Sequence, residues 1–307
     1  MASPHINNQK PDILVGQTPE CDFSDLQQGI DALATLPEEL SKTIFILDGE
    51  YHGQVISRLS NVTITGVGFV RLTAGHGALE VLPNGEERGT FRTATCFIEG
   101  ENVRLTNLTI ENTAGPGKQA GQAVALFNNA SNATVTNCRL LGYQDTLCTG
   151  PLPPFQKDGT PFVSPIEKEI SYSCQIYRNC YISGTIDFIF GGAEAWFDHC
   201  QIHSRASEQG YITAASTPEG QETGFEFHNC YLTADDGVTN VFLGRPWRPF
   251  AKTTFKHCRL GNHIAPCGWD NWDNPANETT TDYREIDSTP DTTNLRPDWI
   301  TTVESND

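Results

Sequence analysis

The sequence predicts an all-β protein, a parallel β-helix that a short N-terminal helix caps. A five-residue pattern recurs along the chain, in which a polar residue and an Asn or His precede a Cys, and a Leu or Ile follows two residues later. Helical patterns are scarce, and short β-rich segments alternate with Gly and Asn. Such recurrence is typical of solenoids, and β-rich units indicate a parallel β-helix.

The repeated pattern is predicted to form an interior ladder. Its copies are TNCRL (136–140), RNCYI (178–182), DHCQI (198–202), HNCYL (228–232) and KHCRL (256–260), with TNLTI (106–110) and SNVTI (60–64) before them. Because the Cys and the Leu or Ile stand two residues apart, both side chains point to one face of a strand. We therefore expect most cysteines to be buried hydrophobic residues. A disulfide-linked secreted scaffold is the weaker alternative for a domain of this size.

One helix is predicted before the repeats, in residues 22–36, DFSDLQQGIDALATL. Ser24 and Gln27 have the spacing of a capping box. The apolar residues of one helical face are Leu26, Ile30, Leu33 and Leu36. Such a helix would cover the open end of the solenoid. Residues 43–51, TIFILDGEY, are then predicted to be the first buried strand.

Residues 1–307 are predicted to form one domain. Residues 150–171, GPLPPFQKDGTPFVSPIEKEIS, are rich in Pro and Gly and interrupt the repeat, yet repeat units continue on both sides. We therefore interpret them as a long inserted loop and not as a linker between domains. After about residue 273 the chain is polar and rich in Asn, Thr and Asp. We expect this tail to pack along the outside of the helix.

Composition and charge exclude some classes of function. The chain has 20 Lys and Arg against 38 Asp and Glu, a net charge of −18. This balance argues against nucleic acid, which proteins bind by neutralising phosphates. No stretch approaches the ~20 consecutive apolar residues of a membrane helix, and residues 1–12 contain no apolar signal-peptide core. We expect a soluble protein that is cytoplasmic as written, or secreted if a leader preceded this sequence.

Four segments carry the candidate chemistry. They are QAVAL (122–126), GYQDTL (142–147), GTIDFIFGG (184–192) and LGRPW (243–247). Asp145 and Asp187 each stand among apolar residues, where an unpaired charge is costly. If neighbouring coils stack, both carboxylates can project from one face. Two acids in different surroundings titrate apart, so that one is protonated while the other is ionised. That division suits a general acid and a nucleophile.

Neutral and cationic side chains complete the candidate site. Gln122 and Gln144 are amide donors suited to a developing oxyanion. Arg245, which the rigid Pro246 follows, can hold a carboxylate by a bidentate contact. The alternatives are structural: Asp145 and the two glutamines could belong to hydrogen-bond ladders, and Arg245 to a surface ion pair.

Gln144 and Asp145 are neighbours, and neighbours in a strand point to opposite faces. For both side chains to reach one cleft, residues 144–145 must form a turn or a bulge. A regular strand with Gln144 buried inside would contradict this prediction.

Taken in order, the four segments resemble the pectin methylesterase family. The resemblance runs from about Phe23 to Trp272 and includes ENTAGPGKQAGQAVAL, YQDTL, NCYISGTIDFIFG and LGRPWRPFAKT. It implies a right-handed parallel β-helix that hydrolyses the methyl esters of pectin, releasing methanol and a free carboxylate. The implied partner is pectin or an oligogalacturonide, with no metal and no cofactor, and we expect a monomer.

The resemblance also implies a role for each candidate. Asp187 attacks the ester carbonyl and forms an aspartyl acyl-enzyme. Asp145 gives its proton to departing methanol and then activates water. Gln122 and Gln144 stabilise the negative oxygen, and Arg245 orients Asp187.

Further expectations concern the cleft and the cysteines. Trp247 is predicted to stack on a sugar ring, and Phe190 to line the cleft, whereas Trp269 and Trp272 are interpreted as structural or rim residues. The 150–171 insertion is expected to form a wall of the cleft and to alter which chain lengths bind. In the family, the position of Cys180 and Cys200 can carry a disulfide; here free thiols remain equally open.

Other expectations rest on asparagines and on total charge. Three of the Asn-x-Ser/Thr asparagines lie in or beside strand repeats and are interpreted as ladder residues; the four are Asn61, Asn107, Asn132 and Asn277. The excess negative charge favours esterified stretches of pectin over bare polygalacturonate. Competing functions are a polygalacturonase or lyase, an esterase for a different ester, and a non-catalytic carbohydrate-binding solenoid.

Overall fold

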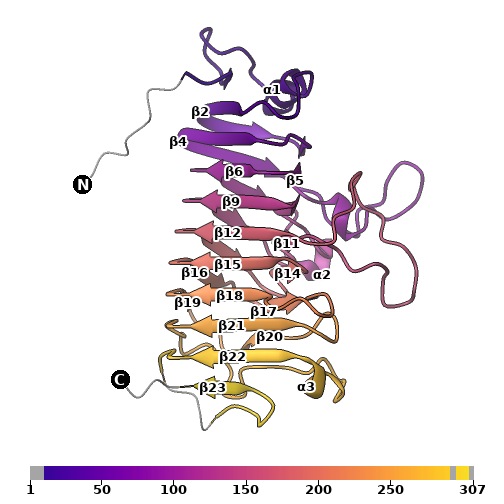
Figure 1. Ribbon diagram of the computed structural model, residues 1–307, viewed down its shortest axis with the longest axis vertical. Coiled ribbons are helices and arrows are strands. Elements are labelled where there is room, and N and C mark those ends of the chain that lie inside the picture. The colour runs from indigo at the N-terminus through magenta and orange to yellow at the C-terminus, as the bar shows by residue number, and fades with distance from the viewer. Residues whose placement is uncertain (1–9, 291–294, 304–307) are drawn as a thin grey trace.

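The structure is a computed structural model that describes residues 10–290 and 295–303. Its strands stack into a column, with the N-terminal segment at one end and the C-terminal strands at the other (Figure 1). Every pair of neighbouring strands is parallel, and the chain winds as a right-handed parallel β-helix. Each full coil contributes one strand to each of three faces, as β12, β13 and β14 do.

The three faces are built from equivalent strands of successive coils. Face 1 contains β6 (Val103–Thr106), β9 (Asn132–Thr136), β12 (Cys174–Arg178), β15 (Glu194–Asp198), β18 (Phe225–His228), β21 (Lys252–Lys256), β22 (Asp282–Ile286) and β23 (Thr301–Val303). Face 2 contains β7 (Thr109–Asn112), β10 (Arg139–Leu141), β13 (Tyr181–Gly184), β16 (Gln201–Ser204) and β19 (Tyr231–Ala234). Face 3 contains β3 (Val55–Ser57), β5 (Cys96–Gly100), β8 (Leu126–Ala130), β11 (Leu147–Thr149), β14 (Ile189–Gly191), β17 (Gly210–Ala215) and β20 (Val241–Gly244).

At the N-terminal end the long strand β4 (Val62–Ala74) pairs with both β6 and β7 and so joins faces 1 and 2. Strand β2 (Lys42–His52) pairs with β4, and the short strand β1 (Ile13–Val15) pairs with β2. Residues 43–51 were predicted to form the first strand, but β1 precedes them, so they lie in the second strand of the chain. Val15 in β1 is fully buried, because it packs under the capping helix.

The repeated pattern marks the corner between faces 1 and 2. The Asn or His before each Cys has a positive φ, a conformation that Asn and His adopt more readily than most residues. These corner residues are Asn137, Asn179, His199, Asn229 and His257. The Cys that follows turns inward at each corner and is at most 2% exposed; the ladder is Cys138, Cys180, Cys200, Cys230 and Cys258. The predicted interior ladder is thus confirmed.

The cysteines of the ladder are thiols. The backbone N–H of Cys180 lies 3.4 Å from Sγ of Cys200. All ten cysteines, each within the described part of the chain, are free. In this structure the open question about Cys180 and Cys200 is answered in favour of free thiols.

One copy of the pattern, SNVTI, lies at a different corner from the others. Two observations place SNVTI at the start of face 1. Ile64 pairs with Leu105 of β6, and the side chain of Asn102 donates a 2.9 Å hydrogen bond to that of Asn61. It is therefore equivalent to the segment around Asn102 and not to TNLTI. Local sequence could not separate the two corners, since both use an asparagine. The ladder interpretation holds for Asn61, Asn107 and Asn132, which share hydrogen bonds with asparagines of adjacent coils.

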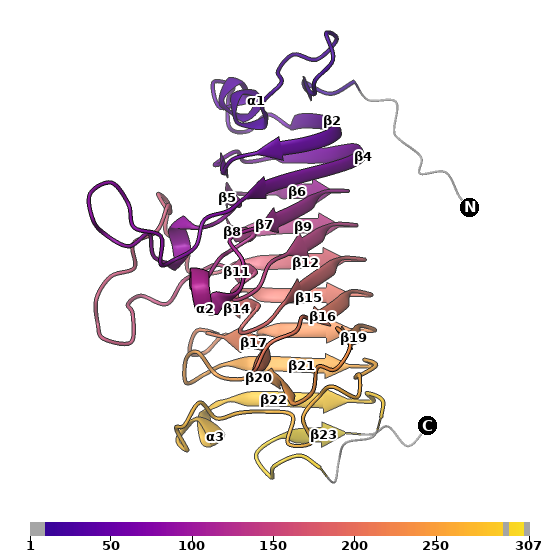
Figure 2. The same ribbon diagram turned by 180° about the vertical axis from the view of Figure 1, so that it is seen from behind.

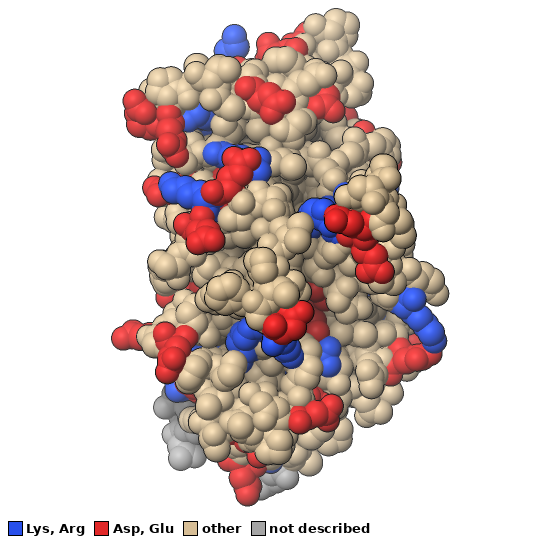
Figure 3. Space-filling view, turned by 90° about the vertical axis from the view of Figure 1, so that its right-hand side faces the viewer, with Lys and Arg blue, Asp and Glu red and all other residues tan. Residues whose placement is uncertain are grey.

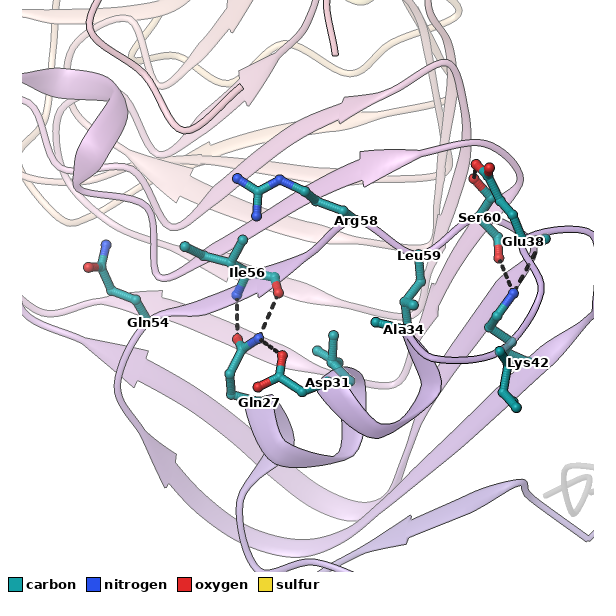
Figure 4. A pocket seen from close by; sticks show the side chains of 12 residues that line it. Gln27, Asp31, Ala34, Glu38, Lys42, Gln54, Ile56, Arg58, Leu59 and Ser60 are labelled. Carbon is teal, nitrogen blue, oxygen red and sulfur yellow. Dashed lines mark hydrogen bonds between the residues drawn. The ribbon is translucent and has the colours of Figure 1, made fainter. Parts of the chain in front are cut away.

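Helix α1 (Leu26–Leu33) caps the column, as predicted, but its start differs from the prediction. Asp25, and not Ser24, is the N-cap and accepts a 3.0 Å hydrogen bond from the N–H of Gln28. The helix ends at Leu33, so Leu36 lies beyond the apolar face and is 43% exposed. Gln27 exchanges two hydrogen bonds with the backbone of Ile56 and so ties the helix to β3 (Figure 4).

A pocket of ≈ 680 Å³ lies between α1 and the first coils (Figure 4). The ammonium group of Lys42 on its wall donates to the carbonyls of Pro37 and Leu40 at 2.9 Å each. Lys42 thus satisfies backbone acceptors that the end of a solenoid would otherwise leave unpaired. This pocket is at the end of the column, whereas the candidate residues lie in its middle coils.

The C-terminal residues do not form the predicted outer tail. Strands β22 and β23 continue face 1 beyond β21, with Phe255 opposite Glu285 and Ile286 opposite Val303. Tyr283 is 1% exposed and stacks on Trp269 with ring centroids 4.3 Å apart. The polar composition misled the prediction, because alternate residues of an outermost strand face water. A short helix, α3 (Asn277–Thr280), precedes β22.

Candidate functional site

Asp145 and Asp187 occupy the same position in consecutive coils. Each lies in the turn from face 2 to face 3, and Leu147 two residues after Asp145 pairs with Ile189 two residues after Asp187. Both aspartates have a positive φ, 66° and 50°. The turn predicted at residues 144–145 is therefore confirmed. It interrupts the strand alternation that would otherwise separate Gln144 from Asp145.

The candidate residues come from five successive coils and lie in face 3 or in the turns beside it. Gln122 precedes β8, the Gln144–Asp145 pair precedes β11, and Asp187 precedes β14. Tyr211 lies in β17 of the next coil, and Arg245 follows β20 of the coil after that. Residues that are distant in sequence thus converge because the coils stack in register.

Arg245 holds Asp187 by two hydrogen bonds. Nε of Arg245 donates to Oδ1 at 2.9 Å, and Nη2 donates to Oδ2 at 2.8 Å. The guanidinium also lies between two aromatic rings, 3.8 Å from the centroid of Tyr211 and 3.9 Å from that of Trp272. A planar cation that is held on both faces has little freedom, so its carboxylate partner is fixed in orientation.

Tyr211 and Trp272 are site residues that the sequence analysis missed. Trp272 had been interpreted as a structural or rim residue, and Tyr211 had not been considered. Trp269, the other tryptophan of CGWDNW, is 2% exposed and donates from Nε1 to Glu285, in line with its structural interpretation. Strand alternation around CGWDNW could have suggested that its two tryptophans face opposite sides of the chain. No local pattern pointed to Tyr211.

The two aspartates have different electrostatic surroundings. Burial raises the pKa of Asp145 well above its ordinary value, and the nearby charge of Asp187 raises it further. Burial also raises the pKa of Asp187, but its hydrogen bonds and ion pair with Arg245 oppose that rise. Both side chains belong to residues that are only 8% exposed. The arrangement favours a proton on Asp145 and a negative charge on Asp187.

This pKa difference predicts a stability effect. An acid whose pKa is raised by folding binds more protons in the native state, so it destabilises the protein as pH rises above the unfolded-state pKa. Asp145→Asn removes this acid while keeping its shape. We expect the variant to be more stable than the wild type at pH 8, by more than ~1 kcal/mol.

The measurement is urea unfolding at pH 8 and at pH 4. The gain should shrink at the lower pH, because Asp145 of the unfolded wild type, with an ordinary pKa of 3.8, is then partly protonated. Asp198→Asn, at a partly exposed ion pair with Arg178, provides the matched control. An Asp145→Asn variant that is less stable at pH 8 would contradict the assignment of a protonated Asp145.

The two glutamines lie beside the aspartates. The backbone N–H of Ala123 donates to the carbonyl of Gln144 at 3.0 Å, which aligns their coils. Among the described residues, neither glutamine amide donates a hydrogen bond to another protein group. Helix α2 (Gly117–Ala120) lies directly against Gln144, because a Cβ at Gly117 would collide with its Oε1. Both amides are therefore available to a bound group.

Aromatic residues form one wall next to the carboxylates. Trp247 is half-buried and lies 5.7 Å from Phe190, 6.0 Å from Phe162 and 6.5 Å from Phe91 between ring centroids. Phe190 is only 3% exposed. The prediction that Phe190 lines the cleft therefore needs correction, because the ring packs beneath its neighbours and supports Trp247.

The inserted segment lies between β11 and β12 and is attached to the column at both ends. Near its start, Arg248 donates from Nη2 to the carbonyl of Phe155 at 2.8 Å. Near its end, the buried carboxylate of Glu99 accepts from the backbone N–H of Lys168 at 3.0 Å, and Arg58 donates to the carbonyl of Pro165 at 2.7 Å. The insertion and the loop before β5, which contains the short 3₁₀ helix η1 (Thr90–Arg92), project from the same side of the column as α2 (Figures 1 and 2).

Charges of both signs are interspersed on the side from which these loops project (Figure 3). Within the described ranges, no helix is long and apolar enough to cross a membrane. Likewise, no group of three or more His, Cys, Asp or Glu side chains in those ranges is arranged to hold a metal ion.

A parallel β-helix with two buried aspartates in neighbouring coils, one of them held by a bidentate arginine, defines a β-helix enzyme with a two-carboxylate site. The pectinesterase family model matches residues 12–160 and 170–302. The chain therefore belongs to the pectinesterase family.

Relatives and solved structures agree with this assignment. The chain is 32% identical to Pectinesterase 31 of Arabidopsis thaliana over 89% of this chain and 81% of that protein. It is 33% identical to Pectinesterase 1 of Solanum lycopersicum over 81% of this chain and 43% of that protein. Among solved structures, pectin methylesterase from carrot superposes with a TM-score of 0.80 at 26% identity, covering 96% of this chain and 89% of that one.

Proposed function

We propose that the protein hydrolyses methyl esters of pectin through an aspartyl acyl-enzyme, releasing methanol and a free carboxylate. The observation that carries the proposal is the pair of buried aspartates in adjacent coils, one of which Arg245 holds by two hydrogen bonds. Family membership supports the substrate, since solved relatives include a pectin methylesterase in complex with a hexasaccharide.

In the first half of the proposed reaction, an ionised oxygen of Asp187 attacks the ester carbonyl carbon. The carbonyl oxygen becomes negative, and the amides of Gln122 and Gln144 donate to it. When the tetrahedral species collapses, the bond to methoxide breaks and the proton of Asp145 passes to it. Methanol leaves, and an anhydride joins Asp187 to the substrate.

In the second half, Asp145 is a carboxylate and takes a proton from water. The resulting hydroxide attacks the carbonyl carbon of the substrate, and the anhydride bond breaks. The pectin carboxylic acid and ionised Asp187 are released, the new acid loses its proton to solvent and becomes a carboxylate, and Asp145 is again protonated. The raised pKa of Asp145 supports both of its roles, because a group with a pKa nearer neutrality gives and takes protons well.

We also propose roles for the surroundings. The exposed part of Trp247 would stack on a sugar ring, with Phe190 as its support. The 150–171 insertion would form a wall of the cleft and affect which chain lengths bind. Because pectin is a cell-wall polymer, this activity favours the secreted location over the cytoplasmic one. We expect the protein to act as a monomer on pectin or an oligogalacturonide.

The direct test is an assay of the wild-type protein on highly esterified pectin. We expect methanol release with no increase in reducing ends, because an esterase leaves the sugar chain intact. New reducing ends or unsaturated ends would instead favour a polygalacturonase or a lyase. If neither methanol nor new chain ends are formed, the substrate must be a different ester, or the protein is a binding solenoid.

A further inference from the structure

The inserted segment places a lysine beside the candidate site. Nζ of Lys157 lies 3.9 Å from the ring centroid of Trp272. The guanidinium of Arg245 lies at the same distance from that ring. Lys157 therefore contacts the same indole ring as the arginine that holds Asp187.

Lys157 and Arg248 add positive charge beside the candidate site. Among the described residues, neither Lys157 nor the neighbouring Arg248 forms an ion pair with a carboxylate; Arg248 donates to the carbonyls of Trp247 and Phe155. Burial and the charges of Arg248 and Arg245 lower the pKa of Lys157, and the charge of Asp187 opposes that fall. In a chain with a net charge of −18, cations that form no ion pair beside the candidate site indicate an anionic ligand.

The proposed substrate supplies such an anion. Pectin carries free carboxylates wherever esters have been removed, and a carboxylate bound by Lys157 would belong to a sugar other than the one whose ester is attacked. Because Lys157 and Arg245 contact the same ring, Lys157 lies near the candidate site. Asp187 and Arg245 are paired to each other, so neither competes for that carboxylate.

We propose that Lys157 binds the free carboxylate of a galacturonate unit close to the unit being hydrolysed, and thereby directs the enzyme to partly de-esterified pectin. The inference rests on the proposed function. It reverses the expectation that the negative charge of the chain favours fully esterified pectin. The 38 acidic residues are spread over the whole chain, but recognition depends on the charges within a screening length of the ligand.

The test compares two oligogalacturonides of one length, one fully methyl-esterified and one about half esterified. Lys157→Gln should raise KM for the half-esterified substrate about fivefold at low salt and leave kcat unchanged, since an exposed ion pair contributes at most modestly. KM for the fully esterified substrate should not change. Lys157→Arg should restore the wild-type KM. At about 0.5 M salt the difference between wild type and variant should largely vanish.

Lys168→Gln is the matched control. It removes a lysine from the same insertion, but at the opposite end, where the backbone N–H of Lys168 donates to Glu99. Equal changes in KM on both substrates would overturn the proposal and assign Lys157 to the shape of the cleft. No change on either would also overturn it.

A binding measurement separates this inference from the proposed function. The affinity of unesterified oligogalacturonate for the wild type, measured by calorimetry, should fall with Lys157→Gln and not with Lys168→Gln. If that loss occurs while no methanol is released from any substrate, the proposed function fails and carboxylate recognition by Lys157 stands. If affinity is unchanged while methanol is released, the inference fails alone.

Discussion

Asp187→Asn is expected to reduce methanol release from esterified pectin by at least ~10³-fold, because the amide cannot form the acyl-enzyme. Asn keeps the shape of the side chain, and one of its two hydrogen bonds from Arg245 can persist. The loss should therefore occur in kcat, while substrate affinity changes little. Parallel methanol and reducing-end assays, with Asp198→Asn as the surface control, measure it.

An activated ester distinguishes the nucleophile from the general acid. A nitrophenyl ester of an oligogalacturonide needs no proton on its leaving group. Asp145→Asn should therefore release one equivalent of nitrophenol in a burst and then stall, because no base activates water. Mass spectrometry should detect the sugar attached to Asp187. Asp187→Asn should give neither burst nor adduct. A burst from Asp187→Asn would assign the nucleophile to another residue.

Arg245→Ala is expected to reduce both stability and activity. It leaves the buried carboxylate of Asp187 without its partner, and breaking a buried pair in this way costs about 3–5 kcal/mol. The loss of orientation should lower kcat about 10²-fold or more. Urea unfolding at pH 7 measures the first effect, and methanol release measures the second. Arg284→Ala, which removes a half-exposed ion pair with Asp282, should cost less than ~1 kcal/mol.

The pH profile of activity tests the direction in which Arg245 shifts the pKa of Asp187. Arg245 lowers the pKa of Asp187 against the rise caused by burial. Without the arginine, that pKa rises, so a higher pH is needed to ionise the nucleophile. The acid limb of the activity profile should move to higher pH in Arg245→Ala and less in Arg245→Lys, which keeps the charge but not the bidentate contact. An unshifted acid limb in Arg245→Ala would contradict this account.

Much of the architecture could be predicted from short-range patterns. The recurring Cys and Leu or Ile predicted the interior ladder, because small apolar residues fit the interior. That the Asn or His before each Cys turns a corner came from the structure. The errors came where one local pattern has two structural uses. An asparagine begins face 1 at Asn61 and turns the corner at Asn107, and only pairing between coils separates these cases.

The same distinction applies to the candidate site. The sequence by itself determined the reactive groups: two aspartates among apolar residues, two amides, an arginine before proline, and a turn at 144–145 forced by strand alternation. Stacking of coils decided which groups meet. Arg245 contacts the rings of Tyr211 and Trp272, and Lys157 contacts the ring of Trp272 from the inserted segment. No local pattern contains these contacts, because coil register and the path of the insertion depend on packing across the whole column.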